Sequence, residues 1–242
     1  MNPIITYLMR LFMDELIPPF IRDFKAFIYP LYWLWYKGDK HNIKTVMNFK
    51  EEVFAMNSAD LRKVYEKYKN LGSGRGTDAF DEDYQWVLKH LDRNSKSLLD
   101  VGCGNGFWLD HIAQKPDFSK FELFGLDISH ASDLGPNQSY ICGEIETLPF
   151  EDKSFDVVTC FYVLEHIKNL NQAINELKRV TRRQLFLAVP CQRYNKYTFD
   201  LHVHFFYSPA YFQSIVGMEN SMSTLIGHRN TGHILFCGEM PG

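Results

Sequence analysis

Residues 100–106 are the part of this chain whose types and spacing most clearly suggest chemistry. Asp100 is followed by three glycines at alternate positions, Gly102, Gly104 and Gly106, and the group comes directly after an apolar run. Glycines let main-chain amides approach a ligand closely at such a turn. A carboxylate at this point would repel an anionic pyrophosphate and attract a cationic or amine-bearing ligand.

The same residues disfavour the two common phosphate-binding turns. A dinucleotide fingerprint, G-x-G-x-x-G, would need its third glycine at the position of Phe107. A P-loop would need Gly-Lys-Ser/Thr after the turn, and none follows. The turn therefore favours a ligand that carries positive charge.

The surrounding sequence predicts the elements that would hold this turn. We expect strands over residues 97–101, 122–128, 139–145, 155–163 and 184–190, with an apolar helix face over 170–180 as the crossover that parallel strands need. Ser208 followed by Pro209 predicts a helix start. Residues 223–228 and 233–239 predict a closing antiparallel hairpin. The expected fold class is therefore α/β, with a doubly wound, mostly parallel seven-stranded sheet.

Four segments in order and spacing resemble class I S-adenosylmethionine-dependent methyltransferases. The glycine turn is similar to their motif D/E-x-G-x-G-x-G, and FGLDIS, GEIETLPFEDKSFDVV and CFYVLEHI resemble their motifs at the next three strand ends. The resemblance covers roughly residues 80–240 and is closest to the broad small-molecule grouping with D-V-G-C-G-x-G and L-P-F-x-x-x-S-F-D. It implies S-adenosylmethionine as cofactor and S-adenosylhomocysteine as product.

The resemblance also implies roles for particular residues. Asp127 would hydrogen-bond the two ribose hydroxyls, and Glu144 would accept the adenine amino group, with Glu146 close enough to compete. Asp100 suits the ammonium group of the methionine part. For Asp100 and Asp127 the alternative is that each only caps the following helix. The expected cofactor-binding residues are Asp100, Gly102, Cys103, Gly104, Gly106, Phe107, Asp127, Ile128, Glu144, Ile145 and Phe161.

Histidines are the expected acid–base groups, because an alcohol or phenol acceptor must lose a proton during methyl transfer. We expect His204 and His166 as candidate catalytic residues. The alternatives are that His204 ties its loop down and that His166 caps a strand-to-helix turn. His202 would face the same side as His204 in an extended segment, where the two could also form a metal pair.

We nevertheless expect no metal. In ubiquinone-type O-methyltransferases a Glu-x-x-Glu-His arrangement can bind a divalent metal at this place, but Tyr162 replaces the first acid here, before Glu165 and His166. The five cysteines form no C-x-x-C pair, so they predict neither a zinc knuckle nor a disulfide framework. They fit a reducing cytoplasm.

Residues 1–75 differ in texture from the methyltransferase-like domain expected over 76–242. Phe20, Ile21, Phe24, Phe27 and Ile28 predict one face of a helix that begins at Pro18-Pro19. Residues 1–75 form either a helical cap, packed on the catalytic domain or on the second subunit of a homodimer, or a membrane-interface segment with peripheral contact through residues 1–37. The glycine-rich joint at 71–78 is either a linker or a hinge.

The overall charge of the chain argues against one class of binding partner. The formal net charge is −3 and the isoelectric point about 6.3, so no nucleic acid is expected. The sequence predicts a cytoplasmic enzyme, either free or peripheral at the membrane, that methylates a small-molecule, glycan-linked or lipid-linked acceptor, with oxygen preferred. The alternative is a non-catalytic S-adenosylmethionine-binding module.

Overall fold

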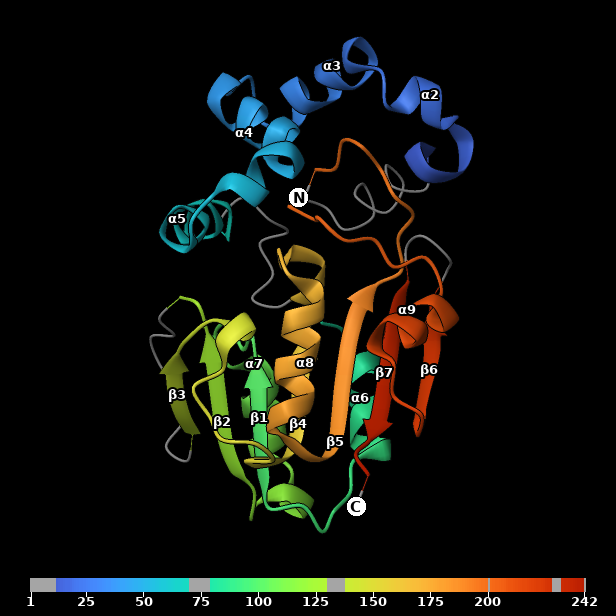
Figure 1. The fold of residues 1–242 in the computed structure, drawn as a ribbon. Helices are drawn as coiled ribbons and strands as arrows, with labels where there is room; N and C mark the ends of the chain where they lie inside the picture. Colours follow the sequence, from blue (N-terminus) through green and yellow to red (C-terminus); the bar gives the residue numbers. More distant parts are fainter. Residues whose placement is uncertain (1–11, 70–78, 130–137, 200, 228–231, 242) are drawn as a thin grey trace.

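The chain folds around a central sheet, shown in the computed structural model of Figure 1. The structure describes residues 12–69, 79–129, 138–199, 201–227 and 232–241. Within these ranges the sheet has seven strands in the order β3-β2-β1-β4-β5-β7-β6, and β7 runs antiparallel to both of its neighbours. The predicted fold class, a mostly parallel doubly wound sheet closed by an antiparallel hairpin, is confirmed. The strands are β1 Ser97–Val101, β2 Glu122–Asp127, β3 Gln138–Cys142, β4 Phe155–Phe161, β5 Thr181–Pro190, β6 Ser221–Ile226 and β7 His233–Glu239.

Helices cover both faces of the sheet (Figure 1). α8 (Leu170–Val180) and α9 (Pro209–Val216) pack on one face, and α6 (Asp81–His90) and α7 (Phe107–Ala113) pack on the other. The central strands β1 and β4 are consequently buried along their length, which explains their unbroken apolar sequence. This leaves the carboxyl ends of the parallel strands as the edge where a ligand can approach.

Local signals explain the helices that the sequence predicted. α8 begins at Asn169, whose side chain accepts a hydrogen bond from the amide of Gln172, and its apolar face is buried as expected. α9 begins after Ser208, whose hydroxyl accepts from the amide of Tyr211 at 3.2 Å, with Pro209 as its first residue. The predicted start of α9 and the predicted apolar face of α8 are confirmed.

Four strands end one to three residues earlier than predicted, among them β2 at Asp127 and β6 at Ile226. β3 ends at Cys142, and β4 ends at Phe161 because Tyr162 adopts a left-handed conformation with φ of 58° that no strand continues. β5 begins earlier than predicted, at Thr181, directly after α8. The loops that follow β3 and β4 therefore begin sooner, and they carry residues expected at the site.

The single amphipathic helix predicted near the N-terminus is wrong. The chain forms α2 (Pro19–Arg22) and α3 (Lys25–Trp35), separated by an extended residue, Phe24. Phe24 is largely exposed, whereas Arg22 is buried and its Nη2 donates to the carbonyl of Tyr194 at 2.9 Å. The remaining short elements and helices are η1 Phe12–Leu16, α4 Lys40–Glu52, η2 Val53–Ala55, α5 Ser58–Lys69, η3 Pro116–Phe118, η4 Ile145–Thr147 and η5 Leu164–His166.

The N-terminal helices pack on the segment between β5 and α9. Tyr32 and Tyr36 donate their hydroxyls to the carbonyls of Thr198 and Phe199, the second bond at 2.9 Å. The ammonium of Lys50 donates to further carbonyls of the same segment. One apolar cluster joins the two parts, with Tyr32 stacked on Phe199 at 4.6 Å between ring centroids. The described helices thus cover the segment that follows β5, while the joint predicted at 71–78 lies outside the described residues.

Candidate functional site

The glycine turn lies at the carboxyl end of β1 and requires glycine for two different reasons. Gly102, Gly104 and Gly106 have φ of 79°, 54° and 79°, which favours glycine at each position. A Cβ on Gly102 would overlap Cγ2 of Val163, whereas a Cβ on Gly104 would meet nothing within 4 Å. Gly102 is therefore needed for packing, and Gly104 leaves open space beside its main chain for a ligand.

Asp100 lies beneath this turn with its side chain buried. Its Oδ1 accepts a hydrogen bond from Thr159 Oγ1 at 2.7 Å. Burial raises the pKa of Asp100 to about 7; the Thr159 hydrogen bond opposes this rise, and the charge of Asp127 adds to it. Asp100 does not cap α7, whose N-cap is Gly106 without a side-chain bond. A cation bound nearby would favour the ionised form.

Asp127 ends β2 beside the glycine turn. Its Oδ2 accepts from the amide of Gly104, and its Oδ1 accepts from both the amide and the hydroxyl of Ser129, each at 2.9 Å. The carboxylate therefore orders the glycine turn and the start of the following loop together. It is half-buried, at the strand end where the ribose contact was predicted.

The loop after β3 distinguishes its two acids. Glu146 Oε1 accepts from the amide of Asn169 at 2.7 Å, at the start of α8. Glu144 Oε2 accepts from the hydroxyl of Ser58 on α5 at 3.2 Å. The carboxylate of Glu146 is thus bound to the start of α8, whereas that of Glu144 contacts α5. Ile145, between them, is buried in the core.

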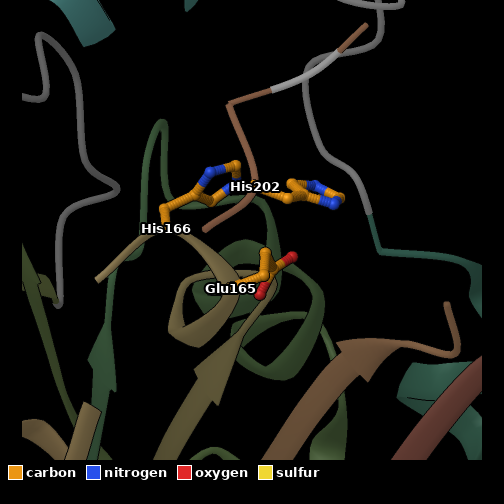
Figure 2. A group of neighbouring side chains, drawn as sticks. All are labelled: Glu165, His166 and His202. Carbon is orange, nitrogen blue, oxygen red and sulfur yellow. The ribbon is translucent and has the colours of Figure 1, made fainter. Parts of the chain in front are cut away.

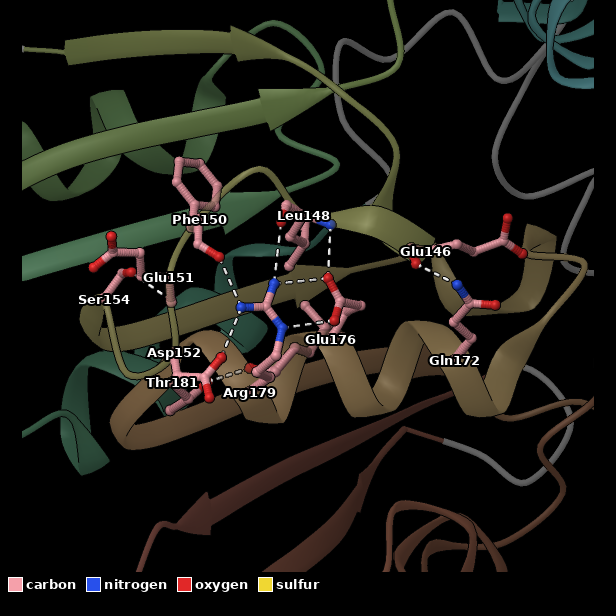
Figure 3. Close-up of polar contacts among 11 residues, drawn as sticks. Glu146, Leu148, Phe150, Glu151, Asp152, Ser154, Gln172, Glu176, Arg179 and Thr181 are labelled. Carbon is pink, nitrogen blue, oxygen red and sulfur yellow. Dashed lines mark hydrogen bonds and ion pairs between the residues drawn. The ribbon is translucent and has the colours of Figure 1, made fainter.

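Arg179 of α8 fixes the rest of this loop (Figure 3). Its guanidinium donates to the carbonyls of Phe150 and Leu148 and forms a two-point ion pair with Glu176, with N–O distances of 2.7 and 2.8 Å. Glu176 in turn accepts from the amide of Leu148. The hydrogen bonds from Arg179 lower the pKa of Glu176, so this clamp is intact at neutral pH. It holds the segment predicted to contact the adenine.

The other predicted cofactor residues also lie near this edge, in different surroundings. Cys103 is buried, and its Sγ fills the space that a side chain at Gly125 would need. Phe107 is about half exposed and lines an open pocket of about 380 Å³ between α6 and α7. Phe161 ends β4 and packs 5.6 Å from Trp108, between ring centroids. Ile128, half-buried, follows Asp127.

The two predicted catalytic histidines each donate to a backbone carbonyl. His204 Nε2 lies 2.7 Å from the carbonyl of Ile167, and His166 Nδ1 lies 3.1 Å from that of Leu201. Burial lowers the pKa of His204, against the effect of its backbone hydrogen bonds. Both contacts join the loop after β4 to the segment after β5, as the structural alternative for His204 expected.

Three potential metal ligands come together at the same place (Figure 2). One ligand atom from each of Glu165, His166 and His202 lies within 4.8 Å of the others. His202 Nδ1 is 2.8 Å from Gln192 Oε1, which orients its ring. The expectation of no metal rested on Tyr162 and stays a prediction. The structure shows that Tyr162 points elsewhere and that His202 comes from a different segment.

Tyr162 belongs to a partly buried polar cluster that the sequence did not predict. Its hydroxyl lies 2.6 Å from Asp83 Oδ2 and 2.5 Å from His233 Nδ1. Asp83 is on α6 and His233 begins β7, so the three residues are far apart in sequence. No spacing or motif connects them. The departure of Tyr162 from the family pattern was the one signal available.

The proteins to which this chain is similar include named methyltransferases. The chain is 25% identical over 125 residues to a ubiquinone biosynthesis O-methyltransferase of Coxiella burnetii, covering 48% of this chain and 53% of the relative. It is 30% identical over 135 residues to a demethylmenaquinone methyltransferase of Staphylococcus aureus, covering 51% and 53%. The chain thus spans about half the length of these curated relatives.

Solved structures match the fold more widely. A Burkholderia thailandensis 1,6-didemethyltoxoflavin-N1-methyltransferase, solved with S-adenosylhomocysteine, superposes with a TM-score of 0.57 at 13% identity over 78% of this chain and 89% of that one. At this identity the likeness shows the fold. Residues 99–189, from β1 to β5, match the family model described as a methyltransferase domain. Residues 99–189 are therefore similar to methyltransferase domains, and they make up less than half of this chain.

Proposed function

We propose that this protein is an S-adenosylmethionine-dependent methyltransferase acting on a small-molecule, lipid-linked or glycan-linked acceptor, with oxygen as the preferred acceptor atom. The observation that carries the proposal is the glycine turn, with open space at Gly104 and carboxylates of Asp100 and Asp127 at adjacent strand ends. A positively charged sulfur nucleoside suits this donor set better than a phosphate does.

Each residue of the site has a proposed task. Asp127 would accept hydrogen bonds from both ribose hydroxyls, and Glu144 would accept one from the adenine amino group. Asp100 would stabilise positive charge near the glycine turn from its buried position. The bound cofactor supplies an electrophilic methyl group on a sulfonium, so the remaining task of the chain is to align the acceptor and remove its proton.

Two observations support the proposed acceptor class: the activity named for one relative, and the segments that lie beyond the carboxyl edge of the sheet. One relative is an O-methyltransferase of ubiquinone biosynthesis, which favours oxygen and an apolar acceptor. The helices α2 to α5 and residues 192–199 and 201–203 lie beyond the carboxyl edge of the sheet, where they would contact whatever enters from that side (Figure 1). We infer that these two segments select the acceptor.

Asp127→Ala should weaken S-adenosylhomocysteine binding by roughly 30- to 150-fold, because losing a charge-assisted two-point contact costs about 2 to 3 kcal/mol. Isothermal titration calorimetry measures this. Asp117→Ala removes an exposed carboxylate far from the turn and is the matched control, with unchanged affinity expected. Equal affinities for both variants, or a wild-type protein that binds NAD and not S-adenosylhomocysteine, would refute the assignment.

A turnover assay distinguishes an active methyltransferase from a non-catalytic S-adenosylmethionine-binding module. Catechol and octyl glucoside, a phenol and an alkyl-linked sugar, serve as oxygen acceptors, and S-adenosylhomocysteine formation is measured. Binding of the cofactor without product from either acceptor, or from a pooled lipid extract, would favour the non-catalytic module.

A second proposal concerns the membrane, and exposed apolar residues favour it. Leu16, Phe20, Phe24 and Leu34 are 69%, 78%, 64% and 73% exposed, and Lys25 and Lys37 lie near them in the sequence. Such a set on neighbouring short helices is typical of a surface that contacts lipid. Among the described residues no helix is long and apolar enough to cross a membrane. We propose that α2 and α3 lie on a membrane that contains anionic lipid.

Replacing Phe20 and Leu34 together by Glu should reduce co-sedimentation with phosphatidylglycerol vesicles at least tenfold. Each buried apolar side chain contributes about 1.5 to 3 kcal/mol to such binding. Phe54→Glu, at a residue that is 62% exposed outside α2 and α3, is the control and should leave binding unchanged. If the intact chain does not sediment, or light scattering shows a dimer that the double substitution splits, the exposed face binds a second copy of this chain instead of lipid.

A further inference from the structure

The cluster of Asp83, Tyr162 and His233 has the hydrogen-bond pattern of a proton-accepting histidine. Asp83 is fully buried, and its Oδ2 accepts from the amide of Phe80 at 2.9 Å and from the hydroxyl of Tyr162. His233 Nδ1 lies 3.2 Å from both carboxylate oxygens of Asp83 and 2.5 Å from Tyr162 Oη. An ionised carboxylate only accepts hydrogen bonds, so Nδ1 must carry the proton and Nε2 the lone pair.

The lone pair of His233 is available to a ligand. Nε2 takes part in no hydrogen bond with any residue that the structure describes, and the side chain is 13% exposed. The ring of Phe80 packs against the imidazole at 4.2 Å between centroids. Among the residues that the structure describes, the titratable groups in contact with this histidine are Asp83 on α6 and Tyr162 after the end of β4. They hold the ring through Nδ1 and make no hydrogen bond to Nε2.

The cluster lies at the ligand-binding edge of the sheet. His233 begins β7 and pairs with Pro190, the last residue of β5, while Tyr162 directly follows β4. The next residue, Val163, is the one that packs against Gly102 in the glycine turn. The positive φ of Tyr162 is a strained conformation for a side-chain-bearing residue, and such strain concentrates at functional sites.

We propose that His233 is the general base of methyl transfer, with Asp83 and Tyr162 as positioning residues. The inference rests on the proposed function. As the acceptor oxygen bonds to the methyl carbon, the sulfur–carbon bond breaks and its electron pair stays on sulfur, giving neutral S-adenosylhomocysteine. The acceptor proton moves to Nε2, and the imidazolium is stabilised by the Asp83 carboxylate until it releases the proton to water.

His233→Gln should lower kcat/KM by roughly 10²- to 10⁴-fold and remove the rise of rate with pH that a histidine base produces. Its affinity for S-adenosylhomocysteine should not change. Exogenous imidazole should partly restore the activity of His233→Ala, which a purely structural histidine would not allow. Tyr162→Phe removes the hydroxyl of Tyr162 but leaves the contact between His233 and Asp83 in place. It should reduce kcat with little change in the KM for S-adenosylmethionine. His204→Gln is the comparison, because the sequence predicted His204 as the base.

Three results would overturn the assignment. The first is a His233→Gln enzyme with wild-type rate and pH profile on catechol or octyl glucoside; the second is a profile that changes with His204→Gln alone. The third is independent of activity, because long-range proton–nitrogen spectra of ¹⁵N-histidine-labelled protein report which nitrogen of neutral His233 is protonated. Protonation on Nε2 would contradict the cluster geometry. A wild-type protein that binds S-adenosylhomocysteine without turnover would instead refute the proposed function, and with it any catalytic role of His233.

Discussion

Asp100→Asn should stabilise the ligand-free protein at pH 8 and weaken its binding of S-adenosylmethionine. Burial raises the pKa of Asp100 from 3.8 to about 7, so the folded state binds a proton that the unfolded state releases. This contribution to stability is present below about pH 4 and is lost as pH rises toward 7. An upper bound for the loss is on the order of 4 kcal/mol. Asparagine can still accept from Thr159 and carries no charge to desolvate.

The same substitution tests the ligand. Wild-type affinity for S-adenosylmethionine should rise as pH passes through 7, because the ionised carboxylate favours a cation, and Asp100→Asn should lose this dependence. Chemical denaturation at pH 5 and pH 8 with calorimetry at both values measures the two effects. The measurements need no acceptor.

Asp156→Asn is a control with the opposite expected sign. Asp156 is also buried; burial opposes its ionisation, but hydrogen bonds from the Lys96 amide and from Arg182 lower its pKa. Its stabilising contribution is present above the unfolded pKa and is lost as pH falls through the folded one. The substitution should therefore destabilise the protein at pH 8. If Asp100→Asn destabilises it as well, the carboxylate of Asp100 is ionised and stabilised in the folded state.

The central part of the fold was predictable from local sequence. β1 and β4 are unbroken apolar runs because helices bury both of their faces, and α8 shows its buried face at helical spacing. Glycines at residues 102–106 mark the turn because left-handed backbone favours that residue type. These features depend on neighbours within a few residues, which periodicity and spacing report.

Contacts between distant segments were not predictable in the same way. At the helix break at Phe24, Arg22 is buried and donates to the carbonyl of Tyr194. The residues near Arg22 in the sequence do not indicate this acceptor. The cluster around His233 likewise joins α6, the end of β4 and the start of β7. Single residues at no fixed spacing give no periodic signal. The sequence therefore pointed to His166 and His204, which lie near recognisable motifs, and not to His233.

Gly102→Ala should destabilise the protein by roughly 2 to 5 kcal/mol, while Gly104→Ala should cost only about 1 to 2 kcal/mol. Both positions have positive φ, so both substitutions carry backbone strain. At Gly102 the added methyl also overlaps Val163, whose main chain belongs to the turn after β4, whereas at Gly104 it meets nothing within 4 Å. The difference between the variants therefore reports packing at Gly102.

The variant with the smaller loss of stability, Gly104→Ala, should nevertheless lose affinity for S-adenosylhomocysteine. Gly104→Ala places its methyl in the space proposed for the nucleoside, so S-adenosylhomocysteine binding should fall at least tenfold in a protein whose melting temperature is nearly unchanged. Val163→Ala added to Gly102→Ala should recover part of the lost stability, since it removes the overlapping Cγ2 atom. Full affinity of Gly104→Ala would mean that the nucleoside does not approach the main chain at this turn, and the ligand assignment for the strand-end carboxylates would fail with it.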